Sequence, residues 1–386
     1  MQVSQLLNGH PNRTLAAARP ERFESTDDLD RWLGQLRPRI SALLTGFVQD
    51  RCAEYVRDVP GAEFVTSLLT EFVPGGKYVR STFTYLGWLS GSRGPTELSE
   101  ELDAPLRAAA STELMHAFAL LQDDVMDQSA LRRGRPALHV QLADWHRALG
   151  LDGPAERFGE SAAILLADLC LVWAEQLFRD SGLPATALAR GWPRYDLLRG
   201  ELAVGQFADL VHDARSEPTF DEVLDVIRRK SGNYTVRRPL ELGAALAGAD
   251  EPTLAVLGDY GGLVGEAFQL RDDVLGVFGR PDVTGKPSGG DLREHKATSV
   301  VVLAADMASP VQDAELSRLC RRDDLDDADL DRWRQLIIDT GAPARIEQLI
   351  AERVTAACDR LAASDLGPFV RHALAELAVR YTNRAR

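Results

Sequence analysis

Apolar residues at helical spacing run through nearly the whole chain and limit its fold more than any other feature. From Leu29 onward, Leu and Ala recur three or four residues apart, and alternating β-branched runs are few. Leu and Ala are also among the strongest helix formers. The sequence therefore predicts an all-α fold.

Clusters of Gly, Pro, Ser and Asp divide this pattern into helices of roughly 10 to 25 residues. We predict a helix start at residues 26–30, a helical pattern over 291–307, and a solvated helix entry in the acidic run 323–329. Breaks are predicted at Pro60-Gly61, Pro74-Gly75-Gly76, 90–95, 152–154, 181–184 and 279–290.

Two of the predicted helices are long and lead to paired aspartates. Residues 101–128 contain no Gly and only one Pro, near the start, which allows a long helix that ends near Asp123. A second apolar segment, 254–278, reaches Asp272, and its glycines at positions 258, 261, 262 and 265 indicate close helix packing.

Length and composition narrow the class of protein. We expect one all-α domain over 26–386, after a leader, 1–25, that is a candidate for disorder. The leader has no apolar signal-peptide run, and no window has the ~18 apolar residues needed to span a bilayer, so a cytoplasmic protein with no membrane span is expected. A net charge of -14 argues against nucleic acid as a partner. The four cysteines form no CxxC pair and give no zinc or disulfide pattern.

The first aspartate cluster, Asp123-Asp124-Val125-Met126-Asp127, closes an apolar helix. At about 100° per residue, Asp123 and Asp127 project from nearly the same face, while Asp124 points to the side. An isolated string of this kind is more often solvated surface, but unpaired charges at the end of an apolar helix are costly. Asp272-Asp273 repeats the arrangement. Because Mg²⁺ prefers oxygen ligands and often shares them with phosphate, the two clusters predict one magnesium and diphosphate site.

Basic residues in tight local groups supply the opposite charge. Lys77 and Arg80 follow the glycine turn Gly75-Gly76, and Arg132-Arg133-Gly134-Arg135 follows the first aspartate cluster. Either group alone fits a solvated surface patch equally well. Arg forks, Lys charges and backbone amides at glycine turns are what phosphate recognition uses. Isolated cations stand at Lys230, Lys286 and Lys296.

With these motifs in this order, the chain resembles the trans-isoprenyl diphosphate synthases, the family of farnesyl and geranylgeranyl diphosphate synthases. The resemblance covers roughly residues 73–302 and implies an isoprenoid synthase type bundle of roughly ten or more helices around a central cavity. It rests on Gly75-Gly76-Lys77-x-x-Arg80, Asp123-Asp124-x-x-Asp127 with Arg132-Arg133-Gly134, Gly205-Gln206-x-x-Asp209, Lys230 with Tyr234-Thr235, Phe268-Gln269-x-x-Asp272-Asp273, and Gly285-Lys286-x-x-Gly289-x-Asp291-Leu292.

Three positions depart from the family pattern. Tyr78 and Ser81 replace the Arg and Pro that many bacterial members carry. Gly276 stands where many members have a third Asp in the second aspartate motif.

The resemblance also implies a homodimer with a two-substrate site, in which isopentenyl diphosphate is joined to dimethylallyl, geranyl or farnesyl diphosphate. Asp123 and Asp127 would hold two Mg²⁺ ions and Asp272 a third. The expected catalytic residues are Asp123, Asp127, Lys230, Asp272 and Lys286. The allylic diphosphate would contact Arg132, Lys230, Lys286 and Lys296, isopentenyl diphosphate would contact Lys77, Arg80, His116 and Arg133, and Gln269 is a further substrate-binding candidate.

Product length would depend on residues just before the first cluster. Ala119 lies near the face of Asp123, and Phe118 is rotated roughly 140° from it. Members that stop at fifteen carbons tend to place bulky aromatics four and five residues before the motif or insert two residues within it. This chain has Ala119 and Phe118 there and no insertion. With Met115, these residues are expected to set a C20 product, similar to geranylgeranyl diphosphate synthases.

Three other functions stay open on the sequence. A farnesyl or other-length prenyl diphosphate synthase differs only in its product. A class I terpene cyclase would need Asn/Asp, Ser/Thr and Glu at four-residue spacing, and Asn233, Arg237 and Glu241 have the spacing without the chemistry. Lys77 and Arg80 would also have no purpose in a one-substrate cyclase. A non-catalytic subunit of a prenyl synthase heteromer would usually lack one aspartate motif, and both are present here.

Overall fold

The computed structural model describes residues 26–92, 103–213, 218–279, 289–322 and 324–383. Nearly all of these residues are helical, so the predicted all-α fold is confirmed. In the same ranges, strands are limited to the two-residue hairpin of β1 Leu131–Arg132 and β2 Arg135–Pro136. The expected leader, 1–25, lies outside the described residues.

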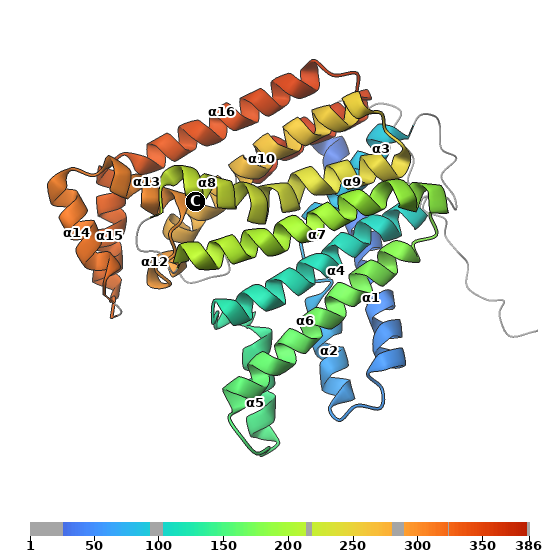
Figure 1. Cartoon of the computed structure of the whole chain (residues 1–386), viewed down its shortest axis with the longest axis horizontal. Helices are drawn as coiled ribbons and strands as arrows, with labels where there is room; N and C mark the ends of the chain where they lie inside the picture. The colour runs from blue at the N-terminus through green and yellow to red at the C-terminus, as the bar shows by residue number, and fades with distance from the viewer. Residues whose placement is uncertain (1–25, 93–102, 214–217, 280–288, 323, 384–386) are drawn as a thin grey trace, which may run out of the picture.

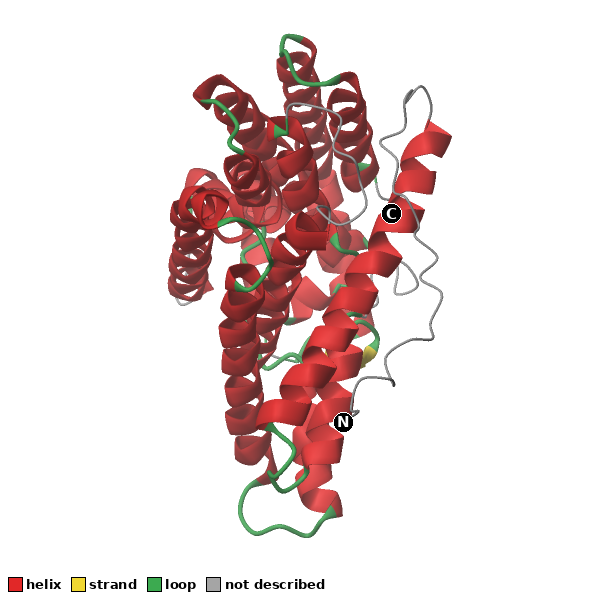
Figure 2. Ribbon diagram, turned by 90° about the vertical axis from the view of Figure 1, so that its right-hand side faces the viewer, coloured by secondary structure: helices red, strands yellow, loops and turns green. Residues whose placement is uncertain are grey.

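Long helices pack side by side into a bundle joined by short loops (Figures 1 and 2). The helices are α1 Thr26–Tyr55, α2 Ala62–Phe72, α3 Val79–Gly91, α4 Asp103–Met126, α5 Leu138–Ala148, α6 Ala155–Arg179, α7 Ala185–Asp213, α8 Phe220–Val226, the π-helix η1 Ile227–Arg237, α9 Arg238–Ala247, α10 Glu251–Phe278, α12 Gly290–Arg293, α13 Ser299–Met307, α14 Pro310–Cys320, α15 Asp327–Asp339, α16 Ala342–Ala362 and α17 Pro368–Thr382.

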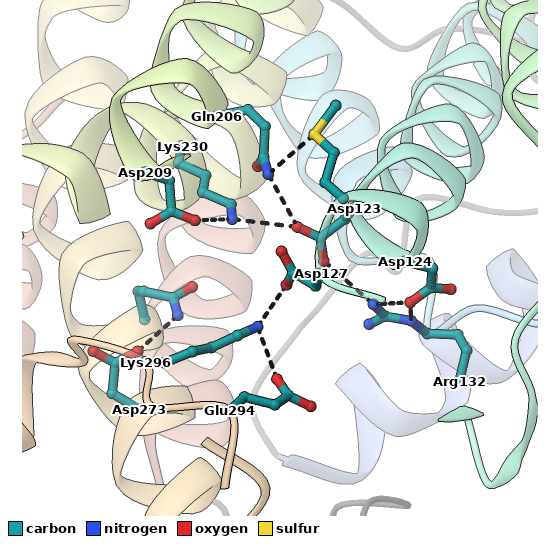
Figure 3. Close-up of polar contacts among 12 residues, drawn as sticks. Asp123, Asp124, Asp127, Arg132, Gln206, Asp209, Lys230, Asp273, Glu294 and Lys296 are labelled. Carbon is teal, nitrogen blue, oxygen red and sulfur yellow. Dashed lines mark hydrogen bonds and ion pairs between the residues drawn. The ribbon is translucent and has the colours of Figure 1, made fainter. Parts of the chain in front are cut away.

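The helix α10 runs through both buried cores of the bundle. One core gathers apolar side chains from α1 to α4, α6, α7, α9, α10 and α17, and the other lies between α10 and the helices α13 to α16. In the first core, α4 packs against α3 and α6, while α7 packs against α9 and η1. The acidic site described below lies where α4, α7, η1 and α10 converge (Figure 3).

Glycines let α10 approach the π-helix η1 closely. A Cβ atom added at Gly265 would lie 2.3 Å from the carbonyl oxygen of Gly232, and one at Gly261 would lie 2.5 Å from the Cα atom of Arg237. The predicted close packing is therefore confirmed at these positions. Gly262 differs, because nothing lies within 4 Å of its Cβ position.

The helical pattern predicted over 291–307 is interrupted. His295 has a φ of 50°, and helix resumes only at Ser299. A left-handed residue cannot continue a right-handed helix, which explains the break. The break places Lys296 outside any helix, and its side chain extends toward the end of α4 (Figure 3).

The acidic run begins α15, as predicted. The side chain of Asp326 accepts a hydrogen bond from the backbone N–H of Asp329, and the side chain of Asp329 accepts one from the backbone N–H of Asp326. Carboxylates at a helix N-terminus satisfy free N–H groups and oppose the positive end of the dipole.

In the part of the chain that the structure describes, α6 is the one helix long and apolar enough to cross a membrane. It packs against α4 and α5, and 44% of its most apolar window is buried inside the fold. Core helices of folded proteins have the same length and composition. Part of its apolar surface is exposed, including Leu165 and Val172.

Candidate active site

The end of α4 brings Asp123 and Asp127 together, as the helical spacing predicts. The N–H of Asp127 donates to the carbonyl oxygen of Asp123 at 2.8 Å and so continues the last helical turn. Figure 3 shows both carboxylates directed toward lysines from other segments. The side chain of Asp127 is the more buried, at 9% exposed against 23% for Asp123.

Cations from three other segments pair with these carboxylates. The Nζ atom of Lys230, from η1, lies 3.3 Å from Asp123 Oδ1, and that of Lys296 lies 2.6 Å from Asp127 Oδ2. Arg132, from β1, lies 3.2 Å from Asp123 Oδ2. The structure thus gathers three of the predicted cations around the first aspartate cluster.

The pairing keeps these groups charged. Burial alone would raise the pKa of Asp123, but Lys230, Arg132 and Lys296 outweigh it and hold that pKa below its usual value. Burial would lower the pKa of Lys230 and Lys296, but their aspartate partners outweigh it and raise both pKa values. At neutral pH the Asp123 carboxylate is ionised and both lysines are protonated.

The chain contains only four lysines, and all of them were predicted at the site: Lys77, Lys230, Lys286 and Lys296. Every other basic side chain among the 44 Lys and Arg residues is Arg. Lysine carries a compact charge on a flexible stem, whereas the Arg fork is held in fixed geometry. Lys286 lies outside the described residues.

Asp124 turns away from Asp127 and binds Arg132. Its side chain is 1% exposed, and Arg132 Nε donates to Asp124 Oδ1 at 2.7 Å. Burial raises the pKa of Asp124 above its usual value, although Arg132 opposes the shift. Arg132, predicted to contact the allylic diphosphate, is thus held by two carboxylates of the first cluster.

The second cluster lies in the last two turns of α10. Asp273 is 7% exposed and accepts hydrogen bonds from the N–H of Ser299 at 2.9 Å and from its hydroxyl at 2.7 Å. Gln269, a predicted substrate-binding residue, donates to Asp273 Oδ1 at 2.9 Å. Asp272, the predicted third metal ligand, is half-buried beside it.

Residues 296–299 join the two clusters. Lys296 binds Asp127 of the first, and Ser299 binds Asp273 of the second. Figure 3 shows Lys296 extending between Asp273 and Asp127. A single four-residue segment therefore contacts both aspartate clusters.

Gly276, where the family pattern has a third Asp, faces Asp291 of α12. A Cβ atom added at Gly276 would lie 1.8 Å from Asp291 Oδ2. Any larger residue at this position would overlap the Asp291 carboxylate. A side chain at position 276 would therefore require the Asp291 carboxylate to turn away.

Arg80, a predicted isopentenyl diphosphate residue at the start of α3, contacts η1. The guanidinium of Arg80 lies 4.4 Å above the ring of Tyr234 and donates to Thr235 Oγ1 at 3.0 Å. Since η1 also carries Lys230, one π-helix contributes to both groups of predicted cations. Such π-helical turns are rare and often occur at functional sites.

Arg133 lies against the glycine turn that precedes Lys77. It donates to the carbonyl oxygen of Phe72 at 2.9 Å, and a Cβ atom added at Gly75 would lie 2.6 Å from its Nη1 atom. The glycine turn and the arginine pair, separated in sequence, therefore meet in space.

His116 faces the same group of cations and is neutral. Burial lowers its pKa well below the usual value, and Arg80, Arg133 and Arg132 lower it further. Its ring lies 6.3 Å from that of Tyr234. No hydrogen-bond partner for its Nδ1 atom occurs among the described residues.

The predicted chain-length residues differ in burial. Met115 is fully buried in the first core, whereas Phe118 and Ala119 are partly buried and pack against it. All three come from the helix that ends in the first aspartate cluster.

Two residues of α7 complete the surroundings of Asp123, although no role was predicted for them. Asp209 forms an ion pair with Lys230, and Gln206 Nε2 lies 3.4 Å from Asp123 Oδ1. Their spacing of three places them on one helix face. The motif Gly205-Gln206-x-x-Asp209 was the signal that could have identified them.

The oxygen donors of Asp123 and Asp127 fit magnesium. In the described ranges no three His, Cys, Asp or Glu side chains are gathered closely enough to hold a metal ion by themselves. Mg²⁺ commonly takes one or two carboxylates and completes its shell with water and substrate phosphate. The donor set therefore suits a metal ion that binds together with a phosphorylated substrate.

Comparisons with known proteins agree with this site. The polyprenyl synthetase family model matches residues 62–337. A geranylgeranyl diphosphate synthase from Mycobacterium tuberculosis is 32% identical over 284 residues, which cover 73% of each chain. A geranylfarnesyl diphosphate synthase from Aeropyrum pernix is 31% identical over 274 residues, which cover 69% of this chain and 77% of the relative.

A solved structure extends the likeness to nearly the full chain. The geranylgeranyl pyrophosphate synthase from Corynebacterium glutamicum, in complex with isoprenyl diphosphate and magnesium, is 36% identical and superposes with a TM-score of 0.86. The superposition covers 92% of this chain and 99% of that one.

Proposed function

This chain belongs to the polyprenyl synthetase family, and on that premise we propose that it makes geranylgeranyl diphosphate in a magnesium-dependent reaction. It is a chain-elongating trans-prenyltransferase, which joins isopentenyl diphosphate to an allylic diphosphate. The pairing of Asp123 and Asp127 with Lys230 and Lys296 carries the proposal. Such a set offers oxygen ligands for metal and positive charge for diphosphate in one place.

Asp123, Asp127 and Asp272 would hold three Mg²⁺ ions at the allylic diphosphate. The bound metal would stabilise the negative charge of the departing diphosphate. The magnesium in the Corynebacterium glutamicum structure supports this choice of ion. Asp124 would act indirectly, because it holds Arg132 beside Asp123.

Lys230 and Lys296 would move from carboxylate to diphosphate oxygens when the allylic substrate binds. Their long flexible stems allow this change without backbone movement. As the allylic C–O bond ionises, their charges stabilise the leaving group and lower the barrier. Arg132, Lys286 and Gln269 are the other proposed contacts on this side.

Lys77, Arg80, Arg133 and His116 would hold isopentenyl diphosphate. The three cations bind its phosphate oxygens, and the neutral His116 can donate an N–H without adding charge. The double bond of isopentenyl diphosphate attacks the allylic cation, a C–C bond forms, and one proton is lost. The released diphosphate accepts that proton, so no histidine base is required.

Product length decides between this proposal and a synthase of another chain length. Purified protein would be incubated with Mg²⁺, isopentenyl diphosphate and each allylic primer, and the dephosphorylated products would be chromatographed. A dominant C20 alcohol supports the proposal. A dominant C15 or C25 alcohol would assign a farnesyl or geranylfarnesyl synthase instead.

Ala119→Phe is expected to shorten the product toward C15. Ala119 is partly buried one turn before Asp123, so a phenyl ring there would reduce the depth open to the growing chain. The same chromatographic assay measures this. An unchanged product distribution would show that the chain grows along a different path.

We also propose that the protein is a homodimer whose interface covers exposed apolar residues of α6 and α7. Leu165, Val172, Val204 and Phe207 are 57–69% exposed. Phe207 adjoins Gln206, which contacts Asp123, so a second copy would adjoin the active site. A partner copy would cover the exposed apolar residues of α6, so no lipid is needed to cover them, in keeping with a cytoplasmic location.

Light scattering tests the dimer. It should give twice the chain mass of 42.3 kDa for the wild type and the single mass for the double variant Val172→Lys with Phe207→Lys.

A further inference from the structure

A buried carboxylate lies among the cations of the proposed isopentenyl diphosphate site. Glu113 is 4% exposed and stands on α4, one turn before His116. A buried negative charge is costly unless hydrogen bonds or opposite charges compensate it. An acid beside an anion site also opposes ligand binding, so its presence needs a separate explanation.

Ser81 supplies the compensating hydrogen bonds. Glu113 Oε1 accepts from the backbone N–H of Ser81 at 2.9 Å and from its hydroxyl at 2.7 Å. Ser81 is fully buried, so water cannot replace these bonds. Because Ser81 is the third residue of α3, its N–H is one of the helix donors that have no partner within the helix.

Glu113 therefore caps α3 from a different helix. The residue at the ordinary capping position, Tyr78, makes no side-chain capping bond and has a left-handed φ of 55°. Left-handed backbone is unfavourable for a bulky residue and persists only where the surroundings hold it. The Ser81 Oγ atom also lies 3.2 Å from the carbonyl oxygen of Tyr78. One glutamate and one serine thus hold the turn between Lys77 and Arg80.

The second carboxylate oxygen of Glu113 faces the glycine turn and Arg133. A Cβ atom added at Gly76 would lie 3.7 Å from Glu113 Oε2 and 3.6 Å from Arg133 Nη2. Burial and Arg132 lower the pKa of Arg133, and Glu113 opposes that shift. Glu113 therefore lies between the segments that carry the three proposed cations.

We propose that Glu113, through Ser81, is a positioning residue that holds Lys77 and Arg80 in place against Arg133 and His116 and so sets the affinity for isopentenyl diphosphate. The inference rests on the proposed function, because it assigns this group of cations to the homoallylic substrate. Loss of a purely structural cap would lower stability and change the KM values of both substrates alike. Loss of a positioning residue would change the KM for isopentenyl diphosphate alone.

The test compares Glu113→Ala, Glu113→Gln and Ser81→Ala in the full chain. We expect Glu113→Ala to raise the KM for isopentenyl diphosphate about tenfold, equivalent to about 1.4 kcal/mol, with the KM for the allylic primer within about twofold of wild type. Glu113→Gln keeps an oxygen that can accept both bonds and should have a smaller effect. Ser81→Ala should raise the KM for isopentenyl diphosphate by an intermediate factor. This variant also tests the proposal if Glu113→Ala does not fold.

Binding of isopentenyl diphosphate alone, measured by calorimetry without allylic primer, gives a readout that is independent of turnover. Its affinity should fall in parallel with the rise in KM. Glu266→Gln is the matched control, because Glu266 is 5% exposed and is bound by Arg228 and Arg353, neither of which is a proposed site residue. It should lower the melting temperature and leave both KM values unchanged.

Arg80→Ala separates failure of this inference from failure of the proposed function. If Arg80→Ala weakens isopentenyl diphosphate binding while Glu113→Ala, Glu113→Gln and Ser81→Ala leave it unchanged, the positioning role is wrong and the site assignment stands. Equal increases in both KM values for the Glu113 and Ser81 variants would also overturn it. If Arg80→Ala has no effect on this binding, the site assignment itself is wrong.

Discussion

At the end of α4, the carboxylates of the first cluster pair with charged side chains, whereas on α10 the buried Asp273 is bound by neutral groups. Asp123 and Asp127 face Lys230 and Lys296, and Ser299 and Gln269 donate to Asp273. Ion pairs with flexible lysines can be exchanged for metal and diphosphate, while a buried neutral network is fixed. We therefore propose different tasks for these carboxylates, which are exchange for Asp123 and Asp127 and positioning for Asp273.

Asp123→Asn should have the largest effect on catalysis. The amide keeps the shape but removes the negative charge that pairs with Lys230 and that we propose to bind metal, so we expect kcat to fall by more than about 1,000-fold. Steady-state kinetics at saturating Mg²⁺ measures it. Asp273→Asn is the comparison on α10. Its kcat should fall less, because the amide oxygen can still accept hydrogen bonds from Ser299. Equal losses would remove the distinction between the clusters.

Lys296→Met should lower kcat by about 100-fold. It removes one of the positive charges that we propose to stabilise the leaving diphosphate. Binding of Mn²⁺ without substrate, followed by electron paramagnetic resonance, should not weaken, because Asp127 loses its competing cation. The two outcomes together define an exchangeable ion pair. A loss of Mn²⁺ affinity would show that Lys296 supports the metal site and does not compete with it.

Gly276→Ala should leave the chain about 1 kcal/mol less stable than the same change at an open position of the helix, because the added methyl group displaces the Asp291 carboxylate. We expect kcat to fall about tenfold as α12 and Lys296 shift. Gly262→Ala is the matched control on the same helix, because its Cβ position is open. Urea unfolding of both variants checks this, and equal stabilities would contradict the close contact.

The pH dependence of stability should run in opposite directions for the two clusters. Asp123 has a lowered pKa, so its contribution to the free energy of unfolding is present above the unfolded pKa of about 3.8. That contribution is lost as pH falls below this value. Burial raises the pKa of Asp273, although Ser299 and Gln269 oppose the shift. The contribution of Asp273 to the free energy of unfolding therefore increases as pH falls through its folded pKa. Urea unfolding of wild type, Asp123→Asn and Asp273→Asn between pH 7 and 3 tests both signs, and parallel curves would contradict them.

Local patterns predicted the fold and much of the site. The helical period placed Asp123 and Asp127 on one face, the glycines of α10 indicated its close packing, and the acidic run began a helix. These features depend on residues within a few positions of one another, or on the absence of a side chain.

Contacts between distant segments were not readable from the sequence. Ser81 meets Glu113 and Ser299 meets Asp273 only because separate helices pack together. The break at His295, which frees Lys296 from a helix, requires a left-handed residue that no turn signal marks. Gly276 appeared as a missing carboxylate, and its contact with Asp291 became visible only in three dimensions.

The most direct test is condensation of isopentenyl diphosphate with an allylic primer by the isolated chain, with and without chelation of divalent metal. We predict a prenyl diphosphate longer by one or more five-carbon units in Mg²⁺, none in excess chelator, and recovery when Mg²⁺ is restored. Condensation that is insensitive to chelator, or a hydrocarbon formed from the allylic diphosphate alone, would contradict the account.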